Sequence, residues 1–93
     1  MKFTNDAFTC GTSLQGRINT TYAELVEKFG EPKAGGDKTT AEWALEFEDG
    51  TVATIYDWKY EETPMYKTNW HIGGKSQEAV YRVYEVMGLM EEV

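Results

Sequence analysis

Apolar and polar residues alternate most regularly between positions 41 and 60, AEWALEFEDGTVATIYDWKY. Alternation with a period of two is typical of strands that bury one face. The Asp49-Gly50 pair between the two runs favours a tight hairpin, because a short turn needs the positive φ angles that glycine adopts readily. With Glu48 and Thr51 flanking the turn, the pairs expected on the apolar face are Phe47 with Val52, Leu45 with Thr54, Trp43 with Tyr56 and Ala41 with Trp58.

The opposite face of this predicted hairpin mixes acidic side chains with small ones and a single isoleucine. Its members are Glu42, Ala44, Glu46, Glu48, Thr51, Ala53, Ile55 and Asp57. A polar face of this kind is common in antiparallel sheets that have one side in water. We therefore expect a sheet that is covered on one face and open on the other.

Two other segments carry apolar residues at helical spacing. The first begins at Thr21, which forms a capping box with Glu24, and it ends before Gly30. The second has Ser76 as its expected N-cap and Gly88 as its stop. The apolar stripes are Tyr22, Leu25, Val26 and Phe29 in the first helix, and Ala79, Val80, Val83, Val86 and Met87 in the second. Each helix should pack on the sheet through its stripe.

Shorter runs predict further strands at 8–10, 13–18 and 68–72. One side of the predicted strand 13–18 carries Leu14, Gly16 and Ile18. In the predicted strand 68–72, one side carries Thr68, Trp70 and Ile72, and the other side carries Asn69 and His71. Gly73 and Gly74 are then expected to turn the chain into the second helix.

In chain order the elements are one or two strands, a helix, three strands and a helix. Tight turns favour an antiparallel meander, and two one-sided helices can cover one of its faces. We therefore predict a single domain over residues 1–93, with an α+β two-layer sandwich fold in which two helices pack on one face of an antiparallel β-meander. A chain of 93 residues is long enough to bury roughly 60% of its unfolded surface.

Charge and cysteine content narrow the classes of function. A formal net charge of −7 and a pI near 4.6 argue against direct nucleic-acid binding, which depends on Lys and Arg. The acidity suits a partner protein with a basic surface, or mimicry of nucleic acid, and it equally suits solubility alone. Cys10 is the only cysteine, and we find no apolar run of signal-peptide or membrane-spanning length. We expect a cytoplasmic protein without a membrane partner.

Four blocks of sequence resemble a known family: GTSLQG at 11–16, TYAELVEKFGEP at 21–32, FEDGTVATIYDWK at 47–59 and WHIGG at 70–74. Together with AEW at 41–43 they resemble a family of small uncharacterised bacteriophage proteins. The resemblance implies a phage origin and action in the cytoplasm of an infected bacterial host. It brings no activity, and a modulator of a host or defence protein is implied by association only.

A second resemblance concerns the unit YAELVEKFGEP followed by a meander, which resembles the helix-then-strands unit of BamE and of β-lactamase-inhibitor-like folds. It covers about a third of the chain and implies, by analogy of fold alone, an interaction surface on the sheet.

The segment WHIGGKSQE, residues 70–78, is the most site-like stretch. Free backbone N–H groups at a helix start, after two glycines, can bind a phosphate or carboxylate. The alternative is an ordinary turn and N-cap, because every helix start has such free N–H groups. It is not a P-loop, because Asn69 occupies the position of the first glycine. A pocket for a nucleotide-like or other small anionic ligand would combine Ser13, Gln15, Asp57, Lys59, Trp70, His71, Lys75 and Ser76. The alternative is that the tryptophans belong to the core.

The acidic residues of the open face form the other candidate surface. A partner with a basic surface would contact Glu42, Glu46, Glu48 and Asp57, although a solvated sheet face has the same composition. His71 is the only histidine, so we expect neither a metal nor another cofactor. A hydrolase in which His71 acts as base with Cys10, Ser13 or Asp57 is a third interpretation.

These observations favour a non-catalytic, acidic inhibitor or modulator that binds through its sheet. A binding protein for a small anionic ligand is the alternative. An exposed edge strand could pair two copies of the chain, so the sequence is compatible with a monomer and equally with a homodimer.

Overall fold

The computed structural model describes residues 3–5, 11–34, 39–58 and 62–88. Along the chain the elements are β1 (Phe3–Thr4), β2 (Ser13–Thr20), α1 (Tyr22–Phe29), β3 (Lys33–Ala34), β4 (Ala41–Phe47), β5 (Val52–Tyr56), β6 (Thr68–Gly74) and α2 (Glu78–Met87). The predicted strand at 8–10, with Cys10, and the predicted site residue Lys59 lie outside the described residues.

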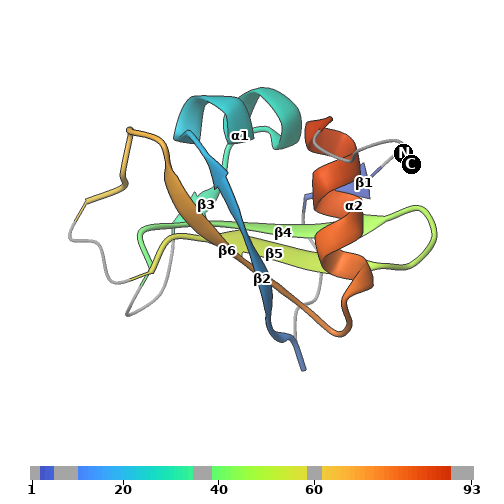
Figure 1. Cartoon of the computed structure of the whole chain (residues 1–93). Coiled ribbons are helices and arrows are strands. Elements are labelled where there is room, and N and C mark those ends of the chain that lie inside the picture. The colour runs from blue at the N-terminus through green and yellow to red at the C-terminus, as the bar shows by residue number, and fades with distance from the viewer. Residues whose placement is uncertain (1–2, 6–10, 35–38, 59–61, 89–93) are drawn as a thin grey trace.

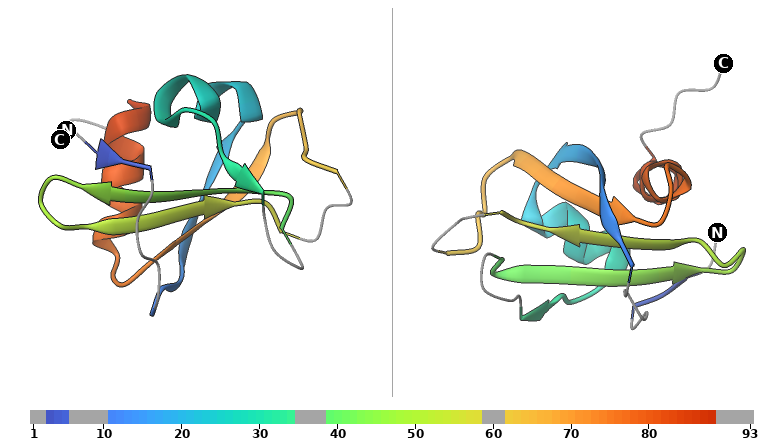
Figure 2. Two further views of the ribbon diagram at one scale, coloured as in Figure 1. Left: turned by 180° about the vertical axis from the view of Figure 1, so that it is seen from behind. Right: turned by 90° about the horizontal axis from the view of Figure 1, so that it is seen from below.

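The strands form one antiparallel sheet in the order β1-β4-β5-β6-β2, and β3 also pairs with β4 (Figure 1). β4, β5 and β6 make the predicted meander, and β2 joins it beyond β6. β1 and β3 pair with opposite ends of the outer edge of β4, as the view from behind shows (Figure 2). Both helices lie on one side of this twisted sheet, which confirms the predicted α+β sandwich.

The core lies between the helices and the covered face of the sheet. Its buried apolar residues are Leu25 and Phe29 of α1, Ala79, Val83 and Met87 of α2, and Ile18, Ala41, Trp43, Leu45, Phe47, Ala53, Ile55, Trp70 and Ile72 of the strands. The rings of Trp43 and Trp70 pack edge to face, 5.6 Å apart. The indole N–H of Trp43 donates to the carbonyl of Gly30 at 2.8 Å. In the described part of the chain, the Trp70 indole N–H is the buried side-chain group that has no hydrogen-bond partner.

The first helix begins and ends as predicted. The backbone N–H of Glu24 donates to the Thr21 hydroxyl at 3.2 Å, which is the first half of a capping box. Gly30 follows the helix at a φ of +87°, a conformation that glycine adopts without strain.

The second helix begins one residue later than predicted, because its N-cap is Gln77 rather than Ser76. Gln77 has helical backbone angles and makes no side-chain cap. Its side-chain amide instead donates to the carbonyl of Gln15 in β2 at 3.0 Å. The predicted stop at Gly88 is confirmed, with a φ of +73°.

The predicted register of the hairpin is wrong by one residue. The observed pairs are Glu46 with Val52, Leu45 with Ala53, Ala44 with Thr54, Trp43 with Ile55 and Glu42 with Tyr56. The turn contains three residues and not two: the N–H of Phe47 donates to the carbonyl of Thr51 at 2.8 Å, and Gly50 closes the loop at a φ of +89°. Since neighbouring residues of a strand point to opposite faces, this shift exchanges the two faces of β5. Tyr56 therefore lies on the open face, and Ile55 is buried in the core.

Gly73 and Gly74 continue β6 instead of turning the chain, which corrects the prediction. A Cβ atom on Gly74 would collide with Ala79 of α2, and one on Gly73 would collide with the Thr54 hydroxyl. Glycine is required at these two positions because α2 and β5 approach β6 closely there and leave no room for a side chain.

A bulge in β2 corrects a second expectation. The pairing of β2 with β6 shifts between Leu14 and Gly16. Leu14 consequently faces away from the core and is 46% exposed, while Ile18 is buried. The bulge separates two residues that strict alternation would place on one face.

Candidate functional site

Four residues from four neighbouring strands form a row across the open face of the sheet. Glu42 of β4 pairs with Tyr56 of β5, Tyr56 pairs with His71 of β6, and His71 pairs with Arg17 of β2. Lys33 of β3 extends the row beyond Glu42. Adjacent strands lie about 4.8 Å apart, and Glu42 and Arg17 are three strand spacings from each other, so their backbones are separated by about 14 Å. The open face therefore has an acidic side on β4 and a basic side on β2.

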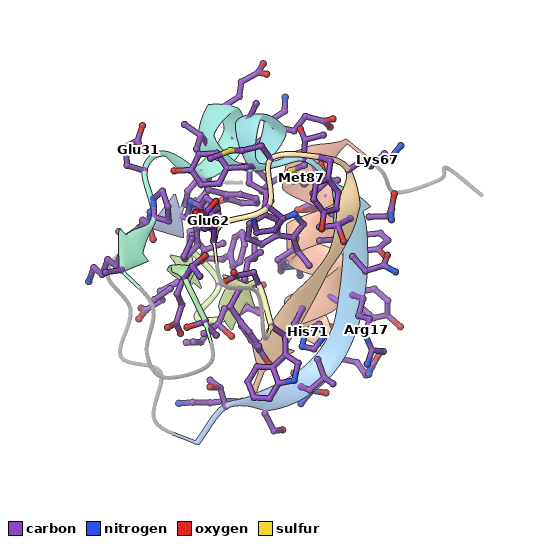
Figure 3. The ribbon with its side chains drawn as sticks, turned by 90° about the vertical axis from the view of Figure 1, so that its left-hand side faces the viewer. Arg17, Glu31, Glu62, Lys67, His71 and Met87 are labelled. Atoms are coloured by element: carbon purple, nitrogen blue, oxygen red, sulfur yellow. The ribbon has the colours of Figure 1, made fainter. Side chains whose placement is uncertain are left out.

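A shallow hollow of about 430 Å³ lies at the basic side of this row, and we call it the aromatic hollow. It is lined by Leu14, Arg17, Tyr56, Trp58 and His71. The ring centroids of Trp58 and His71 are 6.0 Å apart with nearly parallel planes, and Tyr56 meets both rings at steep angles. Figure 3 shows Arg17 and His71 close together on β2 and β6, at the part of the molecule far from α1.

Features of the local backbone explain why the hollow forms there. Gly73 has no side chain, and the Tyr56 ring lies 3.4 Å from the position that its Cβ would occupy. The bulge in β2 brings Leu14 to the open face. Trp58 is the second residue after the end of β5 and is 43% exposed. Gly73 thus leaves a space on the open face, and the large side chains of Leu14 and Trp58 lie around it, so that the surface is concave.

Burial and the guanidinium group of Arg17 both affect the titratable groups of the hollow. Burial, and then the positive charge of Arg17, lower the pKa of His71 below its ordinary value of 6.5. His71 is therefore mostly neutral at pH 7. Burial and the charge of Glu42 raise the pKa of Tyr56 above 10.0, with Arg17 acting in the opposite direction. The described residues of the hollow thus present neutral aromatic rings beside the positive charge of Arg17.

Asp57 does not belong to this surface, which corrects its place in both predicted sites. Only 1% of the residue is exposed. Its carboxylate accepts hydrogen bonds from the N–H groups of Thr40 and Ala41 at 2.7 and 3.1 Å, and from the Thr40 hydroxyl at 2.6 Å. The Thr40 hydroxyl also lies 2.6 Å from that of Thr63. Asp57 therefore ties together the segments that enter β4 and leave β5.

The other residues predicted to bind a ligand are dispersed. Trp70 is fully buried in the core, so it cannot stack on a ligand. Lys75 and Ser76 are exposed between β6 and α2. Gly73 and Gly74 belong to β6, so they do not form the anion-binding turn that the sequence predicted. The Gln15 amide donates to the carbonyl of Gly74 at 3.1 Å and to the Ser13 hydroxyl at 3.2 Å. Among the described members of the predicted set, His71 is the one that lines the hollow.

The acidic residues predicted to contact a partner lie along β4 and its turn. Glu42 is half-buried, whereas Glu46 and Glu48 are exposed. Glu46 and Glu48 also line a second shallow hollow of about 440 Å³ with Phe3, Thr4, Phe47 and Gly50. Without Asp57, this surface consists of three glutamates at the outer side of the sheet.

Sequence reasoning missed four residues of the aromatic hollow: Leu14, Arg17, Tyr56 and Trp58. The one-residue error in register assigned both Tyr56 and Trp58 to the covered face. The signal that was available is the spacing of Tyr56 and Trp58, which puts both rings on one face of an extended chain. No sequence signal located the bulge that exposes Leu14.

Asp57 and His71 do not form the acid and histidine pair that the hydrolase interpretation requires. Asp57 lies on the covered side of the sheet and His71 on the open side. The described residues include no cluster of three or more His, Cys, Asp or Glu side chains placed to hold a metal ion. No helix in the described ranges is long and apolar enough to span a membrane.

Compared with known proteins, the chain matches no family model, and no curated protein or solved structure is significantly similar to it. The class of molecule that the geometry defines is a small α+β domain with one sheet face free of helices. The resemblances to phage proteins and to BamE-like units stay predictions.

Proposed function

We propose that this chain is a non-catalytic binding module that contacts a partner protein through the open face of its sheet. The supporting observation is the acidic side of that face: Glu42 and Glu46 lie on the open side of β4, and exposed Glu48 follows in the turn.

The charge distribution supports a partner with a basic surface. The chain carries a formal charge of −7, and Glu42 and Glu46 lie on the open side of β4. A basic partner would associate faster with such a surface, because complementary potentials steer the encounter. In the phage setting that the sequence resemblance implies, this partner is a host or defence protein whose activity the chain modulates.

The contacts at the edges of the sheet also support binding through the face. The outer edge of β4 is occupied by β3, by β1 and by Asn5, whose side-chain oxygen accepts the N–H of Ala44 at 3.2 Å. Carbonyl groups of β2 accept hydrogen bonds from the side chains of Tyr84 in α2 and of Gln77, the N-cap of that helix. An additional strand would have to displace these groups before it could pair.

A photo-crosslinking amino acid in place of Glu46 tests this proposal. After irradiation in a bacterial lysate, we expect one protein to be attached repeatedly through position 46. The same residue in place of Glu27, on the exposed side of α1, is the matched control and should give no such product. Attachment from Glu27 alone, or equally from both positions, would move the interface away from the sheet.

The captured partner can then be purified and its affinity measured. The pair Glu42→Gln and Glu46→Lys should weaken binding by at least about tenfold, because it removes the acidic side of the face. The pair Glu31→Gln and Glu27→Lys changes the net charge by the same amount at α1 and should have little effect. Equal losses from both pairs would mean that net charge, and not this face, determines the affinity.

A further inference from the structure

The aromatic hollow has properties that contact with a basic partner does not explain. Among the described residues that line it, Arg17 is the charged one, and its charge has the wrong sign for such a partner. The salt bridges between described residues centre on Arg82, and none of them involves Arg17. An exposed guanidinium beside aromatic rings is a site for a group of negative charge.

The size of the hollow limits what it can hold. At about 430 Å³ it falls within the range of small-molecule sites, which measure roughly 300–1,000 Å³. Three of its five lining residues present rings, and these lie within 6.3 Å of one another. A planar group would gain contact area on Trp58 and His71, since flat aromatic surfaces stack at little cost in conformational entropy.

The row across the sheet determines how such a ligand would be oriented. Arg17 lies at the β2 side of His71, and Glu42 lies two strands away on the other side. A negative group would therefore be attracted to Arg17 and repelled by Glu42. The uncharged ring of the same ligand would lie over Trp58 and His71, where the imidazole is mostly neutral at pH 7.

We propose that the aromatic hollow binds a small planar aromatic anion, with its phosphate or carboxylate on Arg17 and its ring against Trp58 and His71. This site is separate from the glutamates of β4 that carry the proposed partner binding. The two proposals can therefore fail independently.

Four probes separate the contributions of ring and charge. AMP and 1-naphthoate each carry a ring and an anionic group, adenosine is the ring system without a charge, and inorganic phosphate is the charge without a ring. His71 is the only histidine, so its ring signals in an NMR titration report on this site without overlap. We expect saturable shifts of His71 with AMP or 1-naphthoate, and binding at least about tenfold weaker for adenosine and phosphate.

Variants at exposed positions test the assignment of residues. Arg17→Gln should weaken binding of the aromatic anion by about tenfold to a hundredfold, because a charge-assisted hydrogen bond is lost. Trp58→Ala should weaken it by roughly tenfold through loss of stacking. Lys28→Gln, on the exposed side of α1, removes the same charge elsewhere and should leave the affinity unchanged.

Two results would overturn the proposal. One is the absence of any His71 shift with either aromatic anion at concentrations up to about 10 mM, a limit that excludes specific binding of useful strength. The other is an equal loss of affinity in Arg17→Gln and Lys28→Gln, which would indicate attraction to positive charge in general. Neither result would bear on partner binding through Glu42 and Glu46.

Discussion

At the scale of single residues, the buried carboxylate of Asp57 has a structural function that its place in the sequence does not reveal. It accepts hydrogen bonds from two backbone N–H groups and one hydroxyl in the segment that enters β4. Buried charges are retained when hydrogen bonds replace the lost water. Asp57 therefore joins the start of β4 to the end of β5, which lie side by side in the hairpin but are far apart along the chain.

The variant Asp57→Ala should destabilise the protein by about 3 kcal/mol, because it leaves the N–H groups of Thr40 and Ala41 without their acceptor. Urea unfolding followed by circular dichroism measures this change. Glu48→Ala, at an exposed acid in the turn, is the control and should change stability by less than about 0.5 kcal/mol. Equal effects of the two substitutions would refute the structural role of Asp57.

At the scale of elements, Arg82 fastens α2 to the turn between β4 and β5. Its guanidinium lies 2.9 Å from the Asp49 carboxylate, and it also reaches Glu78 and Glu85 on its own helix at 3.4 and 3.8 Å. Asp49 additionally accepts the backbone N–H of Thr51 at 3.0 Å. The same aspartate thus shapes the turn and holds the helix beside it.

This contact makes stability depend on acid pH. Hydrogen bonds from Thr51, and then from Arg82, lower the pKa of Asp49 from 3.8 to about 2. Because the pKa is lower in the folded state than in the unfolded state, the stabilisation is complete above about pH 4 and is lost as the pH falls towards 2. In urea unfolding at a series of pH values, wild type and Asp49→Asn should differ most above pH 4 and converge near pH 2. A difference that stays constant over this range would contradict the assignment.

At the scale of the whole molecule, α2 covers the edge of the sheet as well as its face. The Tyr84 hydroxyl donates to the carbonyl of Arg17 at 2.7 Å, and the Gln77 amide donates to that of Gln15 at 3.0 Å. These carbonyls belong to β2, the last strand at this side of the sheet. Free strand edges pair readily with other chains, and side chains that occupy them oppose this pairing.

We therefore expect a monomer whose tendency to self-associate rises when these side chains are removed. In sedimentation equilibrium, the double variant Tyr84→Phe with Gln77→Ala should show a larger average mass that increases with concentration. Tyr81→Phe, at an exposed tyrosine of the same helix, should behave as wild type. An unchanged mass in the double variant would mean that the edge is protected by other groups.

The sequence by itself determined the two helices, the strands of the meander and the class of fold, but not the short strands β1 and β3. The capping box at Thr21, the glycine stops at Gly30 and Gly88 and the apolar stripes of both helices depend on residues within a few positions of one another. Local conformational preference and periodicity therefore suffice to predict them. The alternation in 68–72 likewise separated buried Trp70 from half-buried His71.

Only the tertiary structure decided which side chains meet on the open face. A turn of three residues exchanged the faces of β5, and a bulge moved Leu14 to the side of His71. Gly73 and Gly74 were assigned to a turn because the sequence does not show that Gly73 packs against Thr54 of a neighbouring strand, or that the chain folds back to place Ala79 against Gly74. A one-residue change of register is nearly invisible in a hydrophobic pattern, yet it reverses every side chain of a strand. The aromatic hollow, unlike the fold, is therefore a product of packing between segments that are far apart along the chain.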